Sequence, residues 1–92
     1  MKLSIYSLKQ LSFQGDASLL NCKTAMGEIT VLDNHETFIG VLKPGVMKVV
    51  EKRPQLNGPP SAEFNGASHF FDITSGFLEV RHGNEVRCII EQ

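Results

Sequence analysis

The most constraining feature of this sequence is a series of short runs in which apolar and polar residues alternate. Residues 77–81 are an example, because Leu78 and Val80 alternate with Glu79 and Arg81. A period of two is typical of a strand with one face in the core and the other in solvent. No segment longer than a turn shows the 3.6-residue period of an amphipathic helix. About eight to ten such runs predict an all-β chain, folded as an antiparallel β-sandwich or flattened barrel.

Glycine, proline and asparagine divide these runs and predict where the strands end. We expect Gly15-Asp16 to end the second run. Pro44-Gly45 suits the centre of a type II turn and predicts a hairpin between the strands on either side of it. The expected strands are residues 3–8, 11–14, 17–23, 29–32, 37–42, 46–50, 69–73, 77–81 and 85–90.

Length and charge limit the classes of function. A chain of 92 residues is expected to form one domain, 1–92, whose core needs neither metal nor disulfides. A net charge of −1 gives no overall field that would attract nucleic acid or an anionic membrane. No apolar run is long enough to cross a bilayer, and Met1 leads into a strand-like segment, so we expect a cytoplasmic protein. Residues 51–68, rich in proline and glycine, predict a long loop, mobile or a contact arm.

Two cysteines, Cys22 and Cys88, are too few for a disulfide framework. Both lie in strand-like segments, and unoxidised cysteine is among the most buried residue types. A redox pair or a nucleophilic thiol is the alternative. We interpret both as core residues.

The densest cluster of acidic, histidine and amide side chains lies within residues 26–45. His35, with Glu28, Asp33 and Glu36 nearby, is the only candidate for acid–base chemistry or metal binding. Adjacent residues of a strand point to opposite faces, so His35 and Glu36 do not readily converge. The sequence has no phosphate-binding glycine loop, nucleophile elbow or zinc pattern. The residues alone therefore indicate a small binding or structural module without a cofactor.

Three ordered matches resemble the epsilon subunit of F-type ATP synthases. Phe13-Gln14-Gly15 is similar to a motif near the start of that family, and residues 75–80 are similar to a later one. The third match is the central run, a Gly-Glu pair followed by a turn ending in His and then Leu-Lys-Pro-Gly. Its matching positions are Gly27, Glu28, Leu32, His35, Leu42, Lys43, Pro44 and Gly45.

The sequence also departs from the family pattern. Asp33-Asn34 replaces Pro-Gly before the histidine, and Glu36-Thr37-Phe38 replaces Ala-Pro-Leu after it. One glycine of the motif in residues 75–80 is missing, and the loop at residues 51–68 is longer than usual. The family normally continues into a C-terminal pair of helices where this chain ends, so we expect one of the short forms that lack them.

The resemblance implies a non-catalytic rotor subunit of the central stalk, peripheral to the cytoplasmic face of the inner (plasma) membrane. Its implied partners are the gamma subunit and the c-ring, with no nucleic acid, small-molecule substrate, cofactor or metal. Inhibition of hydrolysis and ATP binding belong to the helices in that family, so we expect neither here. The implied c-ring contacts are Gly27, Glu28, Asp33 and His35. The implied gamma contacts are His35, Phe38, Ile39 and Leu42.

Two other hypotheses remain open at this point. An unrelated β-sandwich adaptor could bind a protein or peptide through an open sheet edge. A small enzyme could use His35 with a neighbouring acid.

Overall fold

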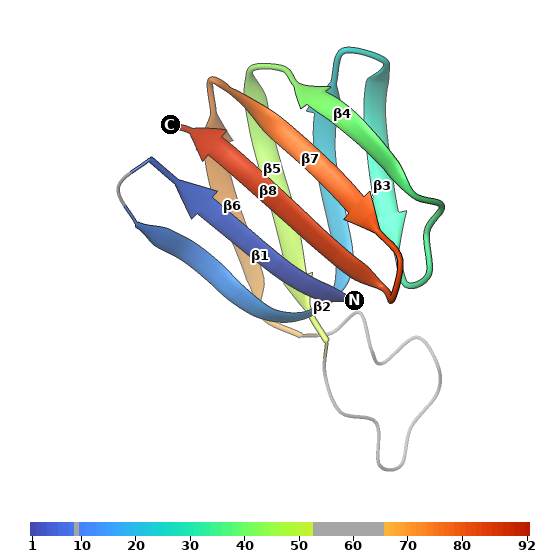
Figure 1. Ribbon diagram of the computed structural model, residues 1–92. Coiled ribbons are helices and arrows are strands. Elements are labelled where there is room, and N and C mark those ends of the chain that lie inside the picture. The colour runs from blue at the N-terminus through green and yellow to red at the C-terminus, as the bar shows by residue number, and fades with distance from the viewer. Residues whose placement is uncertain (9, 53–65) are drawn as a thin grey trace.

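The computed structural model describes residues 1–8, 10–52 and 66–92, and within these residues all regular structure is strand (Figure 1). The prediction of an all-β fold is therefore confirmed. The predicted loop at residues 51–68 lies mostly outside the described residues. The strands are β1 (Lys2–Ser7), β2 (Leu11–Thr24), β3 (Gly27–Leu32), β4 (Phe38–Leu42), β5 (Gly45–Glu51), β6 (Ser68–Ile73), β7 (Ser75–Arg81) and β8 (Glu85–Glu91).

One continuous mixed sheet folds over to make two layers (Figure 1). The front layer contains β4, β7, β8, β1 and the first half of β2, in that order. The back layer contains β3, the second half of β2, β5 and β6. β1 and β8 run parallel, whereas the other pairs are antiparallel, so the expected antiparallel sandwich is confirmed with one exception, this pair.

β2 belongs to both layers and runs without a break for 14 residues. Gly15 pairs with Leu3 of the front layer, while Leu20 pairs with Val49 of the back layer. The pairing register shifts between Ala17 and Leu19, as it does at a β-bulge. The prediction that Gly15-Asp16 ends a strand is therefore wrong, because the backbone turns from one layer to the other there and stays paired.

The predicted hairpin at Pro44-Gly45 is also wrong. β4 pairs with β7 in the front layer, and β5 pairs with β2 and β6 in the back layer. Lys43 and Pro44 therefore cross between layers. The Lys43 amide donates to the Lys23 carbonyl over 2.9 Å, which fixes this crossing against β2.

The core lies between the layers and is filled by the inward residues of all eight described strands. In β8 these are Val86, Cys88 and Ile90, which share a face as their spacing predicts. Cys22 is buried as well, so the interpretation of both thiols as core residues is confirmed. Burial raises the pKa of Cys22 to about 11 and raises that of Cys88 too, which keeps both thiols protonated at neutral pH.

The phenylalanines of β6 divide between the two faces. Phe71 packs against the core. Phe70 is 64% exposed on the outer face. Within the described ranges, no helix is long and apolar enough to cross a membrane.

Gly76 gives a test of this packing. Gly76 and Gly83 both have positive φ, at 152° and 83°. A Cβ on Gly76 would lie 2.2 Å from the Ile89 carbonyl oxygen, whereas a Cβ on Gly83 meets nothing within 4 Å. We predict that Gly76→Ala lowers the free energy of unfolding by about 3 kcal/mol or more and Gly83→Ala by about 1 kcal/mol. Urea unfolding of both variants measures the difference, and equal losses would contradict the packing described here.

Candidate functional site

The candidate c-ring residues lie at opposite ends of the sandwich. Gly27 and Glu28 begin β3, next to the β2–β3 hairpin and the β4–β5 crossing, and we call this the hairpin end. Asp33 and His35 follow β3 and lie at the other end, which we call the turn end (Figure 1). A six-residue strand spans about 17 Å between its first and last residues. The structure therefore does not bring these four residues together.

Local hydrogen bonds shape the hairpin end. The Thr24 hydroxyl donates to the Gly27 carbonyl over 2.8 Å and accepts from the Met26 amide over 3.1 Å. This closes a tight turn that leaves Met26 92% exposed at its apex. The Glu28 side chain is exposed and makes no ion pair with any residue that the structure describes. The hairpin end thus exposes the apolar Met26 side chain at its apex, with the Glu28 carboxylate beside it.

At the turn end, the Asp33 carboxylate holds three separate segments together. It pairs with the terminal ammonium group of Met1 and, at 3.0 Å, with the Lys52 ammonium group. The Asn84 amide nitrogen donates to it over 3.3 Å, and the Asn84 side-chain oxygen accepts from the Asn34 amide over 2.7 Å. The hydrogen bond from the Met1 ammonium, with smaller contributions from Lys52 and Asn84, lowers the pKa of Asp33 to about 2 against the opposing effect of burial. Asp33 therefore has a structural role that the sequence analysis missed.

His35 makes contacts within its own turn. Its Nδ1 lies 2.9 Å from the Glu36 carbonyl oxygen, and its ring packs against Phe38 with centroids 5.4 Å apart. It makes no ion pair with a carboxylate of the described residues. In that same part of the chain, no group of three or more His, Cys, Asp and Glu side chains is placed to hold a metal ion.

The candidate gamma contacts on β4 differ in accessibility. Ile39 is 72% exposed, whereas Phe38 is half-buried against the core. Leu42 is only 3% exposed and belongs to the core. The prediction of Leu42 as a contact residue is therefore corrected, because its side chain offers a partner no surface.

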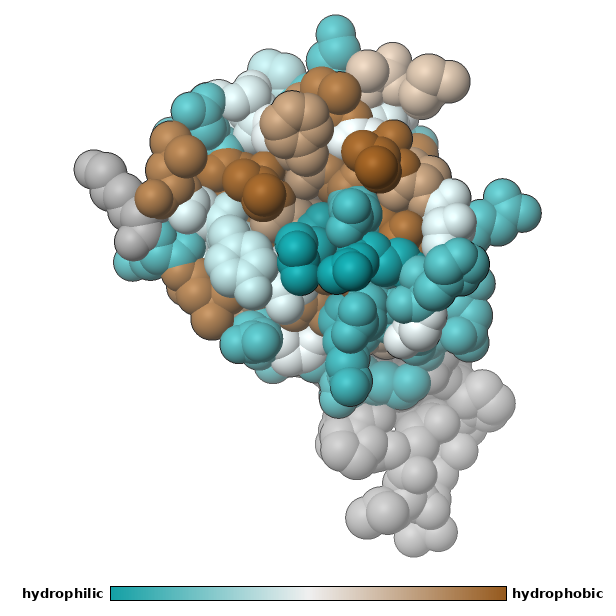
Figure 2. Space-filling model, in the orientation of Figure 1, coloured by the Kyte–Doolittle hydropathy of each residue, from teal (hydrophilic) through white to brown (hydrophobic). Residues whose placement is uncertain are grey.

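An apolar row that the sequence analysis did not identify crosses the outer face of the front layer. Its members are cross-strand neighbours, so they lie side by side although they come from five strands. Figure 2 shows apolar side chains gathered over the upper part of this face, above a polar region. The apolar row consists of Leu11, Tyr6, Ile89, Phe77 and Val41, each between 38% and 57% exposed.

A family model described as the β-sandwich domain of the ATP synthase delta/epsilon chain matches residues 1–58, more than half of the chain. The chain belongs to this family. Family membership confirms the resemblance drawn from the sequence and excludes an unrelated adaptor.

Individual relatives are similar over most of this chain. The ATP synthase epsilon chain of Protochlamydia amoebophila is 32% identical over 82 residues, which are 89% of this chain and 48% of the relative. That of Clostridium novyi is 29% identical over 79 residues, which are 86% of this chain and 51% of the relative. The chain thus spans about half the length of the curated relatives it matches.

Solved structures show the same fold. A chain of the Euglena gracilis mitochondrial ATP synthase structure covers 100% of this chain with a TM-score of 0.80 at 20% identity, over 51% of its own length. A chain of the Tetrahymena thermophila mitochondrial ATP synthase structure, of its central stalk and c-ring, covers 100% with a TM-score of 0.73 at 18% identity, over 63% of its own length. At these identities the comparison establishes the fold of this family member.

We predict that Asp33→Asn destabilises the chain in a pH-dependent way. The pKa of Asp33 is lowered from 3.8 to about 2 on folding, so its ionised form stabilises the fold above pH 3.8. This stabilisation is lost as the pH falls toward 2. At pH 7 we expect Asp33→Asn to lower the free energy of unfolding by about 1–2 kcal/mol. This is less than the cost of breaking a fully buried ion pair, because the carboxylate is partly exposed.

Urea unfolding of the native chain and the variant at pH 7 and pH 2.5 measures this effect. Asp72→Asn is the matched control, since Asp72 is an exposed carboxylate on β6. A loss at Asp33 that is equal at both pH values would show that the ion pair is not its cause.

Proposed function

We propose that the chain acts as a non-catalytic rotor subunit of an F-type ATP synthase, peripheral to the cytoplasmic face of the membrane. In this role it binds the gamma subunit and the c-ring, so that ion-driven rotation of the ring reaches the catalytic head. Family membership supports the assignment to a synthase. The apolar row on the front layer is the observation that carries the proposed role as a binding subunit. Exposed apolar side chains in register across a sheet are typical of a surface that a protein partner covers.

The gamma subunit is the proposed partner of the front layer. Ile39 lies on β4 two residues before Val41, so both side chains are on the outer face and extend the apolar row toward the turn end. Phe38 begins β4, and His35 in the turn before it packs on the Phe38 ring, so we assign both to the border of the same contact. Phe77 lies between Ile89 and Val41 in the row, and buried aromatic rings are where binding energy concentrates in protein interfaces.

The c-ring is the proposed partner of the hairpin end. Gly27 and Glu28 are both exposed there, beside the Met26 apex. Asp33 and His35 lie about one strand length away. One flat contact surface can therefore include Gly27 and Glu28, or Asp33 and His35, but not all four. We assign the ring contact to Glu28, with the apolar Met26 tip beside it. An exposed ion pair from Glu28 would add about 0.2–1 kcal/mol, which suits a contact that sets position more than affinity.

Transmission of torque requires that the two contacts keep their relative positions. β2 joins both layers through continuous pairing, and the β2–β3 hairpin at the hairpin end is an extension of the same strand. A load applied at Glu28 therefore passes along β2 into the front layer, which carries the gamma contact. The fold thus suits a rigid coupler.

We predict that Phe77→Ser weakens binding to the gamma subunit at least tenfold without unfolding the chain. The change removes an exposed ring from the apolar row, and loss of an aromatic anchor of an interface typically costs about 2 kcal/mol or more. Titration calorimetry with purified gamma subunit measures the affinity. Val46→Ser is the matched control, because Val46 has similar exposure on the back layer. Equal affinities of the two variants would contradict the proposed contact.

For the c-ring, we predict that Glu28→Lys weakens binding to the assembled ring about two- to fivefold, which corresponds to an exposed ion pair. Binding of the gamma-bound chain to rings reconstituted in lipid nanodiscs is the measurement. Glu36→Lys makes the same change in charge at the turn end and should leave ring binding unchanged. If Glu36→Lys weakens ring binding more than Glu28→Lys does, the ring contact lies at the turn end and the assignment to Glu28 is wrong.

A further inference from the structure

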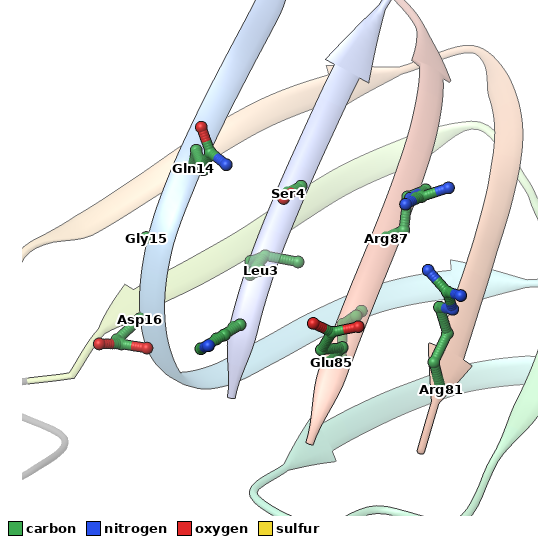
Figure 3. Close-up of a pocket in the computed structure, with 10 residues that line it drawn as sticks. Leu3, Ser4, Gln14, Gly15, Asp16, Arg81, Glu85 and Arg87 are labelled. Atoms are coloured by element: carbon green, nitrogen blue, oxygen red, sulfur yellow. The ribbon is translucent and has the colours of Figure 1, made fainter. Parts of the chain in front are cut away.

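A charged hollow of about 300 Å³ lies beside the apolar row on the front layer. Figure 3 shows its side chains, which come from β2, β1, β8 and β7. The polar region below the apolar side chains in Figure 2 belongs to the same face. A partner can use only those charges of the hollow that neighbouring side chains of the chain do not already neutralise.

The row of side chains nearest the turn end carries no net charge. Asp16, Lys2, Glu85 and Arg81 are successive cross-strand neighbours, and their charges alternate in sign. Neighbours of opposite charge on one sheet face attract each other. This row therefore adds no net charge to the hollow, although the ion pair that Arg81 makes is with Glu79.

Arg87 is different, because its cross-strand neighbours do not neutralise it. Ser4 on β1 is uncharged. Glu79 on β7 is acidic, but its carboxylate forms an ion pair with the Arg81 guanidinium, whose Nε lies 3.3 Å away. Across the described ranges the structure gives Arg87 no ion pair of its own. Arg87 is thus an exposed guanidinium with its donors available.

The position of Arg87 connects the hollow with the apolar row. Arg87 and Ile89 are two residues apart on β8, so they share a face about 7 Å apart. Arg87 and Arg81 rise from adjacent strands into the same hollow (Figure 3). A partner that covers Ile89 therefore places its next side chains over Arg87.

We propose that the hollow receives a carboxylate side chain of the protein that covers the apolar row, with Arg87 as its main ligand. This inference rests on the proposed function, since that protein is the proposed gamma contact. The guanidinium fork matches a carboxylate in a two-point hydrogen-bonded pair. Ser4, beside Arg87, offers a hydroxyl donor to the same group.

The charges in the hollow select a carboxylate over a phosphate. The lining carries Lys2, Arg81 and Arg87 against Asp16 and Glu85, and Glu79 beside it pairs with Arg81. The hollow therefore accommodates at most one added negative charge, which a carboxylate supplies. A phosphate carries about two negative charges and would also face the two acidic side chains at short range. A partner that covers the apolar row also excludes water from the pair. A partner without a carboxylate at this position would therefore leave Arg87 buried without an anion.

Binding of purified gamma subunit to the native chain and to Arg87 variants tests this proposal. We expect Arg87→Gln and Arg87→Glu to weaken binding at least tenfold, as loss of one member of a covered ion pair does. The melting temperature of each variant should match that of the native chain, because Arg87 is exposed. Lys48→Glu is the matched control, since Lys48 is an exposed cation on the back layer and should leave affinity unchanged. Replacing surface carboxylates of gamma by lysine, one at a time, should yield one variant that restores binding of Arg87→Glu.

The possible results separate this inference from the proposed function. If Phe77→Ser weakens binding while Arg87→Glu behaves as Lys48→Glu does, the carboxylate site is wrong and the gamma contact stands. If the native chain binds no gamma subunit, both are wrong. Stabilisation by millimolar inorganic phosphate that depends on Arg87 would replace the proposal with a small-anion site. Self-association that depends on Arg87, seen by sedimentation, would replace it with a contact between copies of this chain.

Discussion

The sharing of β2 between two layers is the constraint on which the rest of this structure depends. Its first half pairs with β1 and its second half with β3 and β5, so every described strand is linked to it directly or through one or two others. Ala17 and Ser18 are both buried where the strand passes between layers, although neighbours in a flat strand would face opposite sides. The layers cannot separate unless this pairing breaks. A stiff body that can carry the two proposed contacts follows from that one strand.

The Asp33 cluster completes this arrangement at the turn end. There the chain start, the residue after β5 and the β7–β8 turn meet at one carboxylate. Asn34 and Asn84 both adopt positive φ, which asparagine tolerates better than most residues. In the family pattern this turn carries Pro-Gly, which fixes the backbone through its own geometry. This chain uses ion pairs and amide hydrogen bonds instead, so its turn depends on charge where a Pro-Gly turn would not.

Sequence patterns predicted the strands whose alternation is local, and failed where the fold depends on layer assignment. Leu78 with Val80, and Cys88 within β8, were placed in the core correctly because one period-two pattern decides both faces. The continuity of β2 and the crossing after β4 were missed, since glycine and proline signal a change of direction without showing which layer follows. The apolar row was missed for a related reason. It contains single residues from five strands, and only the register makes them neighbours.

In the proposed gamma contact, one face of the sheet both holds the partner and orients it. An apolar row alone attracts any complementary apolar surface and permits it to slide or rotate, because hydrophobic burial is non-directional. Arg87 lies to one side of the apolar row, and the charged row beyond it, with Lys2 and Arg81 against Asp16 and Glu85, carries no net charge. A carboxylate that must reach Arg87 while apolar groups cover Phe77 has few orientations to choose from. In the proposed interface, affinity and orientation thus come from different rows of one sheet, at the pleat spacing of about 7 Å.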